Sequence, residues 1–163
     1  MAQTEVLALL ETYSISYSSL MLDERILIVS IAQNNNLEKI AQRAAFSHSI
    51  LEIYELVNIT QLDLNKEINQ FIEKFDPLKS DICEKNQTIS FSVRFRLIGD
   101  FQGGIKGMQL RYEEHAARLG EKIRHNYPSL YVDLNNPMIK LEVLVTPKRL
   151  YYGKILFNIE RKK

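Results

Sequence analysis

The feature that most constrains the fold is the run from Thr88 to Ile98, TISFSVRFRLI, in which apolar and polar side chains alternate. Its apolar positions are Ile89, Phe91, Val93, Phe95 and Leu97, and its polar positions are Ser90, Ser92, Arg94 and Arg96. Successive side chains of a β-strand point to opposite faces, so this period of two predicts a strand with one buried face. The chain therefore has to build a sheet and cover one side of it.

Helical patterns occur on both sides of this strand. Apolar residues at helical spacing predict helices near Val6–Tyr13 with Thr4 as the N-cap, from a cap at Asn36 through Ala45, over 65–75 and over 108–125. Further strands are predicted over 15–22, 25–32, 49–57, 131–134, 138–145 and 150–159. This mixture predicts the α+β class.

The first five elements are predicted in the order α-β-β-α-β, with the two strands forming a hairpin. A ferredoxin-like unit has the order β-α-β-β-α-β, so only its first strand is lacking. We therefore expect residues 1–58 to form an incomplete ferredoxin-like domain in a chain that begins one strand late. We expect residues 59–163 to form a second α/β domain.

The two parts of the chain differ in charge, although the whole chain carries a net charge of only +1. Residues 1–87 hold 7 basic and 13 acidic side chains, a net charge of −6, whereas residues 88–163 hold 14 and 7, a net charge of +7. Such asymmetry predicts that the second part meets a polyanion such as RNA. Mutual attraction of the two parts is the alternative.

Cysteine usage and hydropathy indicate the setting in which the protein works. Cys83 is the single cysteine, so no internal disulfide is possible and a reducing, cytoplasmic location is expected. No apolar run approaches the length of a membrane span, and the N-terminus lacks a signal-peptide pattern. We expect no membrane partner.

Arg94 and Arg96 are the first candidates for an RNA-binding site. They lie one pleat apart on the polar face of the predicted strand, and each guanidinium offers a planar fork of donors to a phosphate. Two alternatives remain open. The arginines are solvated on an antiparallel sheet, or they pair with carboxylates of the first domain.

A basic stripe on the long predicted helix is the second candidate. It consists of Arg111, His115, Arg118, Lys122 and His125, which share one helical face. Such a stripe favours phosphate contacts, whereas the alternative is a solvated face with pairs inside the helix. In the preceding GDFQGGIKG loop (99–107), Lys106 is a further candidate, although a plain connector is the favoured interpretation of that loop.

The sequence offers no catalytic or metal-binding pattern. His48, His115, His125 and Cys83 lack the spacing of metal ligands, and no nucleophile-elbow or glycine-rich cofactor motif is present. In VDLNNP (132–137), Asp133 and Asn135 are expected to bind nearby backbone amides in a turn. We therefore predict no catalytic residue, no metal site and no cofactor site in this chain.

An ordered set of segments gives the sequence a resemblance to a known family. FSVRFR (91–96), LG (119–120), VDLNNP (132–137), IKLEVLV (139–145) and YYG (151–153) together resemble a THUMP domain, an RNA-binding module fused to tRNA-modifying enzymes. EVLALLETY (5–13) is similar to the start of archaeal tRNA guanosine methyltransferases that act at position 10. In those proteins a ferredoxin-like domain precedes the THUMP domain and a methyltransferase domain follows it.

The resemblance implies a division of labour. This chain would hold the acceptor stem and 3′ end of tRNA, while a methyltransferase domain outside it would bind S-adenosylmethionine and methylate a guanosine. The predicted RNA-binding residues are Arg94, Arg96, Lys106, Arg111, Arg118, Lys122, Arg124, Lys148 and Arg149. The alternatives are the THUMP region of another RNA-modifying enzyme such as a thiouridine synthetase, a complete small enzyme, and a protein-interaction domain.

Overall fold

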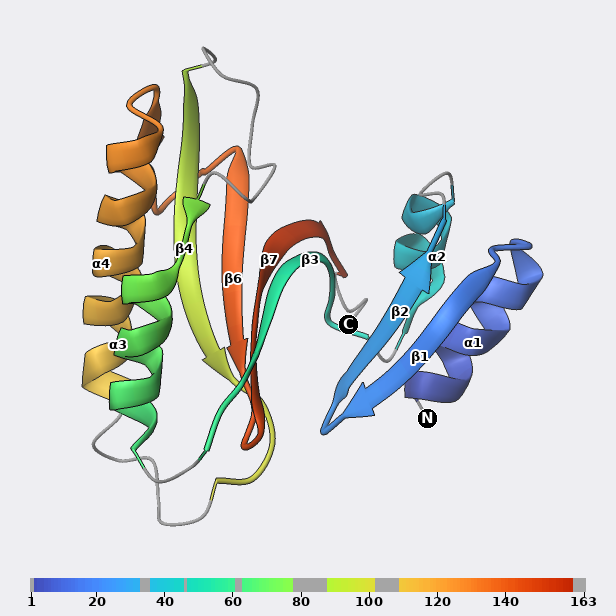
Figure 1. Cartoon of the computed structure of the whole chain (residues 1–163). Helices are drawn as coiled ribbons and strands as arrows, with labels where there is room; N and C mark the ends of the chain where they lie inside the picture. The colour runs from blue at the N-terminus through green and yellow to red at the C-terminus, as the bar shows by residue number, and fades with distance from the viewer. Residues whose placement is uncertain are drawn as a thin grey trace. The chain divides into compact units, whose positions relative to one another are not determined.

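The structure is a computed structural model that describes residues 2–32, 36–45, 47–60, 63–77, 88–101 and 109–159. Contacts between Cα atoms divide it into two compact units (Figure 1). Unit 1 holds residues 1–51 together with 155–163, and unit 2 holds residues 52–154. The α+β class is confirmed, because helices and strands mix in both parts of the chain.

A five-stranded sheet forms the centre of unit 2. Its strand order is β3 (Ser49–Asn58), β7 (Arg149–Asn158), β6 (Ile139–Val145), β4 (Ile89–Leu97) and β5 (Leu130–Val132). Strand β4 pairs in parallel with both β5 and β6, and β6 pairs antiparallel with β7. The strand predicted from strict alternation therefore lies inside a mixed sheet, with a neighbour on each side.

Two helices, α3 (Leu64–Lys74) and α4 (Gln109–Asn126), cover one face of this sheet (Figure 1). The core between the helices and the sheet includes Phe71 and Ile72 of α3, Leu119 and Ile123 of α4, and Phe91 of β4. The apolar positions of β4 thus face the helices, as the alternation predicts. The polar positions of β4 lie on the opposite face, which we call the sheet face.

Unit 1 has the predicted order of elements. It contains α1 (Ala2–Thr12), the antiparallel hairpin of β1 (Tyr17–Asp23) and β2 (Ile26–Ile31), and α2 (Leu37–Arg43). A small core forms where Ala41 and Ala44 meet Ile159, with Leu9, Ile50 and Phe157 packed against them. The end of β7 therefore completes unit 1, although it lies far from α2 in the sequence.

One predicted helix cap is wrong, one is confirmed in position but not in its side-chain hydrogen bond, and one cap was missed. Thr4 lies inside α1, which begins at Ala2. Asn36 occupies the N-cap position of α2 but makes no side-chain cap hydrogen bond, and its amide donates to Tyr13 O at 3.5 Å. Helix α3 begins at Leu64, because the Asp63 side chain accepts a hydrogen bond from Lys66 N at 3.1 Å.

The two compact units do not follow the predicted boundary between residues 58 and 59. Strand β3 enters unit 2 at Glu52, and β7 returns to unit 1 at Ile155, so both strands are shared by the two units. Whether the domains divide functionally at residue 58 stays a prediction.

Candidate nucleic-acid interface

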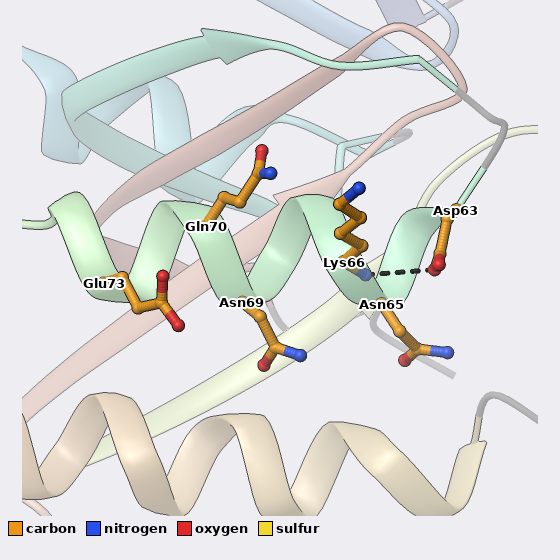
Figure 2. Close-up of a pocket in the computed structure, with 6 residues that line it drawn as sticks. All are labelled: Asp63, Asn65, Lys66, Asn69, Gln70 and Glu73. Carbon is orange, nitrogen blue, oxygen red and sulfur yellow. Dashed lines mark hydrogen bonds between the residues drawn. The ribbon is translucent and has the colours of Figure 1, made fainter.

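The basic stripe of α4 contacts α3 rather than standing free in solvent. His115 is buried, with its Nε2 3.2 Å from Asn65 Oδ1, and the Arg118 guanidinium donates to Asn69 Oδ1. Figure 2 shows Asn65 and Asn69 on the side of α3 that faces the neighbouring helix. Part of the predicted stripe is therefore a polar seam between two helices. The sequence analysis considered phosphate contacts and a solvated face for this stripe, but not contact with another helix.

Lys122 stabilises the C-terminal end of α3. Its ammonium donates to Ile72 O at 2.8 Å and to Glu73 O at 2.5 Å, in the last turn of that helix. The last carbonyls of a helix lack partners within the helix and carry partial negative charge. A cation there donates hydrogen bonds to these carbonyls and offsets their charge. Lys122 therefore holds α4 to α3 through backbone carbonyls.

This contact gives a test of stability. Replacing Lys122 with methionine is expected to lower the free energy of unfolding by about 1–2 kcal/mol, because two carbonyls lose a charged donor. Arg124 is the matched control, since it lies two residues further along α4, is exposed and makes no hydrogen bond or ion pair with other described residues. Denaturant unfolding of both variants measures the difference. Equal loss in the two variants would show that the Lys122 contact contributes nothing specific.

Two open hollows border the helix pair, and neither is a simple anion site. The first runs along α3 and is lined by Asp63, Asn65, Lys66, Asn69, Gln70 and Glu73 (Figure 2). The second is lined by Ile72, Glu73, Arg118, Glu121, Lys122 and His125. Each hollow mixes carboxylates with cations, so the carboxylates oppose the entry of a phosphate.

Arg94 and Arg96 lie on the sheet face, as predicted, but they differ in environment. Arg94 is exposed and makes no hydrogen bond with other described residues. The guanidinium of Arg96 forms an ion pair with Glu142 on β6, with Nη2 and Oε2 2.6 Å apart. Glu142 belongs to the same unit, so this ion pair lies within unit 2. Arg94 is the better phosphate donor of the two.

The remaining predicted residues are spread over the molecule. Arg124 is exposed on α4, and Lys148 is exposed in the turn between β6 and β7. Arg149 Nε donates to Asn58 Oδ1 at 3.2 Å. Lys106 and the side chain of Arg111 lie outside the described residues. Those of the predicted cations that the structure describes therefore occupy the helix side, the sheet face and one turn, and they do not form a single stripe.

The sequence analysis missed one cation of the sheet face, Lys140. This exposed lysine lies opposite Ser92 in the register between β6 and β4, next to the row that contains Arg94. The alternation of IKLEV was a signal that could have found it, because Lys140 and Glu142 occupy the polar positions of a strand whose other positions are apolar. Lys140 and Arg94 together place two exposed cations on one surface, and neither forms an ion pair with another described residue.

Among the residues that the structure describes, Tyr112 of α4 is the one whose pKa is clearly shifted. Its ring stacks on Phe95 with centroids 6.2 Å apart, and burial raises the pKa of Tyr112 to about 12. The phenol is therefore neutral near pH 7 and is a poor general base. Among the described residues, histidine, aspartate and glutamate side chains form no cluster of metal ligands.

None of the helices in the described residues has the length and apolar character that crossing a lipid bilayer requires.

In the turn 132–137, Asp133 Oδ1 accepts hydrogen bonds from Asn135 N at 2.9 Å and Asn136 N at 3.1 Å. The predicted role of Asp133 in a turn is therefore confirmed.

The fold that these elements define is THUMP-like. No family model matches the sequence, and no curated protein matches it. Among solved structures, TrmN from Thermus thermophilus is similar, with a TM-score of 0.61 and 17% identity over 97% of this chain and 43% of that chain.

Two further structures resemble the chain. PH1313 from Pyrococcus horikoshii has a TM-score of 0.55 and 20% identity over 92% of this chain and 45% of that one. A 4-thiouridine synthetase, solved as an RNA complex with bound ATP, has a TM-score of 0.51 and 16% identity over 93% of this chain and 35% of that one. The chain spans less than half the length of each of these proteins, and identities this low show the fold alone.

Proposed function

We propose that this chain is the tRNA-binding region of a tRNA-modifying enzyme of the cytoplasm. The observation that carries the proposal is the THUMP-like fold, which extends over 93% of the chain in the comparison with a 4-thiouridine synthetase bound to RNA. The surface supports it, because Arg94, Arg124, Lys140 and Lys148 are exposed cations of the basic part of the chain. Positive side chains at fixed positions bind phosphates and release counterions.

We further propose that the enzyme is an S-adenosylmethionine-dependent tRNA guanosine methyltransferase. The resemblance of EVLALLE (5–11) and LNNP (134–137) to that family supports this choice over a thiouridine synthetase. The methyl donor would bind to a catalytic domain outside the present sequence. In this arrangement the chain holds the tRNA by shape and phosphates, and the target base is chosen elsewhere.

The experiment compares tRNA binding by the wild type with that of a triple variant, Arg94→Gln, Arg124→Gln and Lys148→Gln. The matched control replaces Arg25, Lys39 and Arg43, which are exposed cations of unit 1, in the same way. We expect the first variant to bind tRNA about tenfold more weakly and the control to bind within about twofold of the wild type. Equal weakening in both variants would show that binding depends on net charge alone.

A protein-interaction domain is the competing function. It predicts no measurable affinity for tRNA at low salt together with tight binding to another protein. A titration of wild-type protein into labelled tRNA at low salt, followed by fluorescence anisotropy, therefore separates the two functions.

A further inference from the structure

Strand β5 forms one edge of the five-stranded sheet, and apolar side chains stand in solvent along that edge. Half of the large apolar residues that are exposed in the described part of the chain lie within residues 131–138. They are Tyr131, Val132, Leu134 and Met138, which are between 48% and 73% exposed. Contiguous apolar surface of this kind commonly marks a protein interface.

The backbone of β5 is open on its outer side. Ser129 O accepts a hydrogen bond from Ile89 N at 3.3 Å, and further along the strand Asp133 N donates to Phe91 O at 2.9 Å. Alternate residues of a strand bond to the same neighbour, so the N–H and C=O of Val132 point away from β4. No other described strand pairs with this edge. The residues of β5 carry no charge, whereas strand edges that remain in solvent commonly carry lysine or proline, which prevent pairing.

The charge of this segment fits a second copy of the same chain. Between Asn126 and Ile139 the one charged residue is Asp133, whose Oδ1 accepts two backbone amides of its own turn. Lys140 lies on β6, and β4 separates that strand from β5. Two copies that meet at this edge therefore bring no cations together, whereas RNA would find no cation within the segment for its phosphates. Tyrosine and methionine are enriched in protein interfaces, and charged residues are depleted from their cores.

The area of this apolar edge is sufficient for a weak dimer. At their exposed fractions the four residues present on the order of 500 Å² in each copy, so a symmetric pair would bury roughly 1,000 Å². Specific interfaces begin near that size. A contact of this area without charged pairs is expected to have a dissociation constant of about 10–100 μM.

We propose that two copies of this chain pair through their β5 strands around a two-fold axis. In an antiparallel pair with Val132 at the axis, the N–H of each Val132 donates to the C=O of the other, and the two sheets become continuous. Tyr131, Leu134 and Met138 surround this contact and exclude water from it. Because β5 is short, these side chains contribute more to the interface than the backbone does. The pairing goes beyond the proposed function and does not require RNA.

Sedimentation velocity of the full chain without RNA, at about 5–500 μM protein, tests the pairing. We expect the wild type to show a monomer–dimer equilibrium and Val132→Lys to weaken the dimer at least tenfold, because it places two like charges at the axis. Leu134→Gln leaves β5 itself unchanged and should weaken the dimer several-fold. Leu22→Lys is the control and should change the dissociation constant less than about twofold, since Leu22 is an exposed leucine of β1 in unit 1.

A mixture of the Val132→Lys and Val132→Glu variants tests the two-fold axis itself. Each variant alone should be monomeric, and the equimolar mixture should dimerise because opposite charges then face each other. Thermal melts show whether each variant is folded. A wild type that stays monomeric, folded Val132→Lys and Leu134→Gln variants that dimerise like the wild type, or a folded mixture that stays monomeric would each overturn the inference. If the wild type is monomeric and Met138→Ser weakens tRNA binding, the apolar edge contacts RNA, and the inference is wrong although the proposed function stands.

Discussion

Replacing Arg96 with methionine is expected to lower the free energy of unfolding by about 3 kcal/mol. The side chain of Glu142 is 6% exposed and that of Arg96 is 30% exposed, and the two groups are 2.6 Å apart. Removing the guanidinium leaves a buried carboxylate without its ion-pair partner, which is far more costly than removing both charges. Denaturant unfolding of the single variant measures this loss.

The double variant Arg96→Met with Glu142→Gln is the control for this prediction. It removes the buried charge as well, so it should recover at least half of the lost stability. A single variant as stable as the wild type would contradict the ion pair. Because Arg96 contributes to folding in this way, weakened RNA binding by an Arg96 variant would not by itself identify a phosphate contact. Arg94 provides the cleaner test on that strand.

Replacing Gly153 with alanine is expected to destabilise unit 2 by about 3 kcal/mol. A Cβ atom at this position would lie 2.2 Å from Glu52 O and 3.2 Å from Ile53 Cα, both backbone atoms of β3. Backbone in a paired strand cannot turn aside as a flexible side chain does, so β3 and β7 would have to separate locally. The glycine of YYG is therefore required by the close approach of two strands.

Gly120→Ala is the matched control for Gly153→Ala. Gly120 lies in α4, and apart from its chain neighbours and the backbone of its own helix no atom lies within 4 Å of the Cβ position there, so alanine should raise stability by up to about 1 kcal/mol through helix propensity. Thermal melts of the two variants should therefore shift in opposite directions. A Gly153→Ala protein that melts with the wild type would contradict the packing of β3 against β7.

Local patterns predicted most of the elements because each pattern states which side chains need burial. The alternation of Thr88–Ile98 required one covered face, and α3 and α4 cover it. The hairpin of β1 and β2 followed from two apolar runs with a short polar turn between them. Nothing local, however, indicates that β3 and β7 would each extend through two units, since the partner of a strand is set by distant residues.

The basic stripe of α4 shows where the sequence is ambiguous. Charged residues at helical spacing mark a polar face, but they do not distinguish a face in water from one that meets the polar face of another helix. Asn65 and Asn69 on α3 provide that second face, and they lie about one helical turn apart, as His115 and Arg118 do on α4. The correspondence between the two helices can be read only once their pairing is known.

The central claim is that exposed cations of the carboxy-terminal part hold the phosphates of a tRNA. Its most direct test is the dissociation constant of the wild-type chain for tRNA across a series of salt concentrations. Four contacts, from Arg94, Arg124, Lys140 and Lys148, predict a slope of about −3 for the logarithm of the association constant against the logarithm of salt concentration. An affinity that salt does not change, or no affinity at low salt, would contradict the claim.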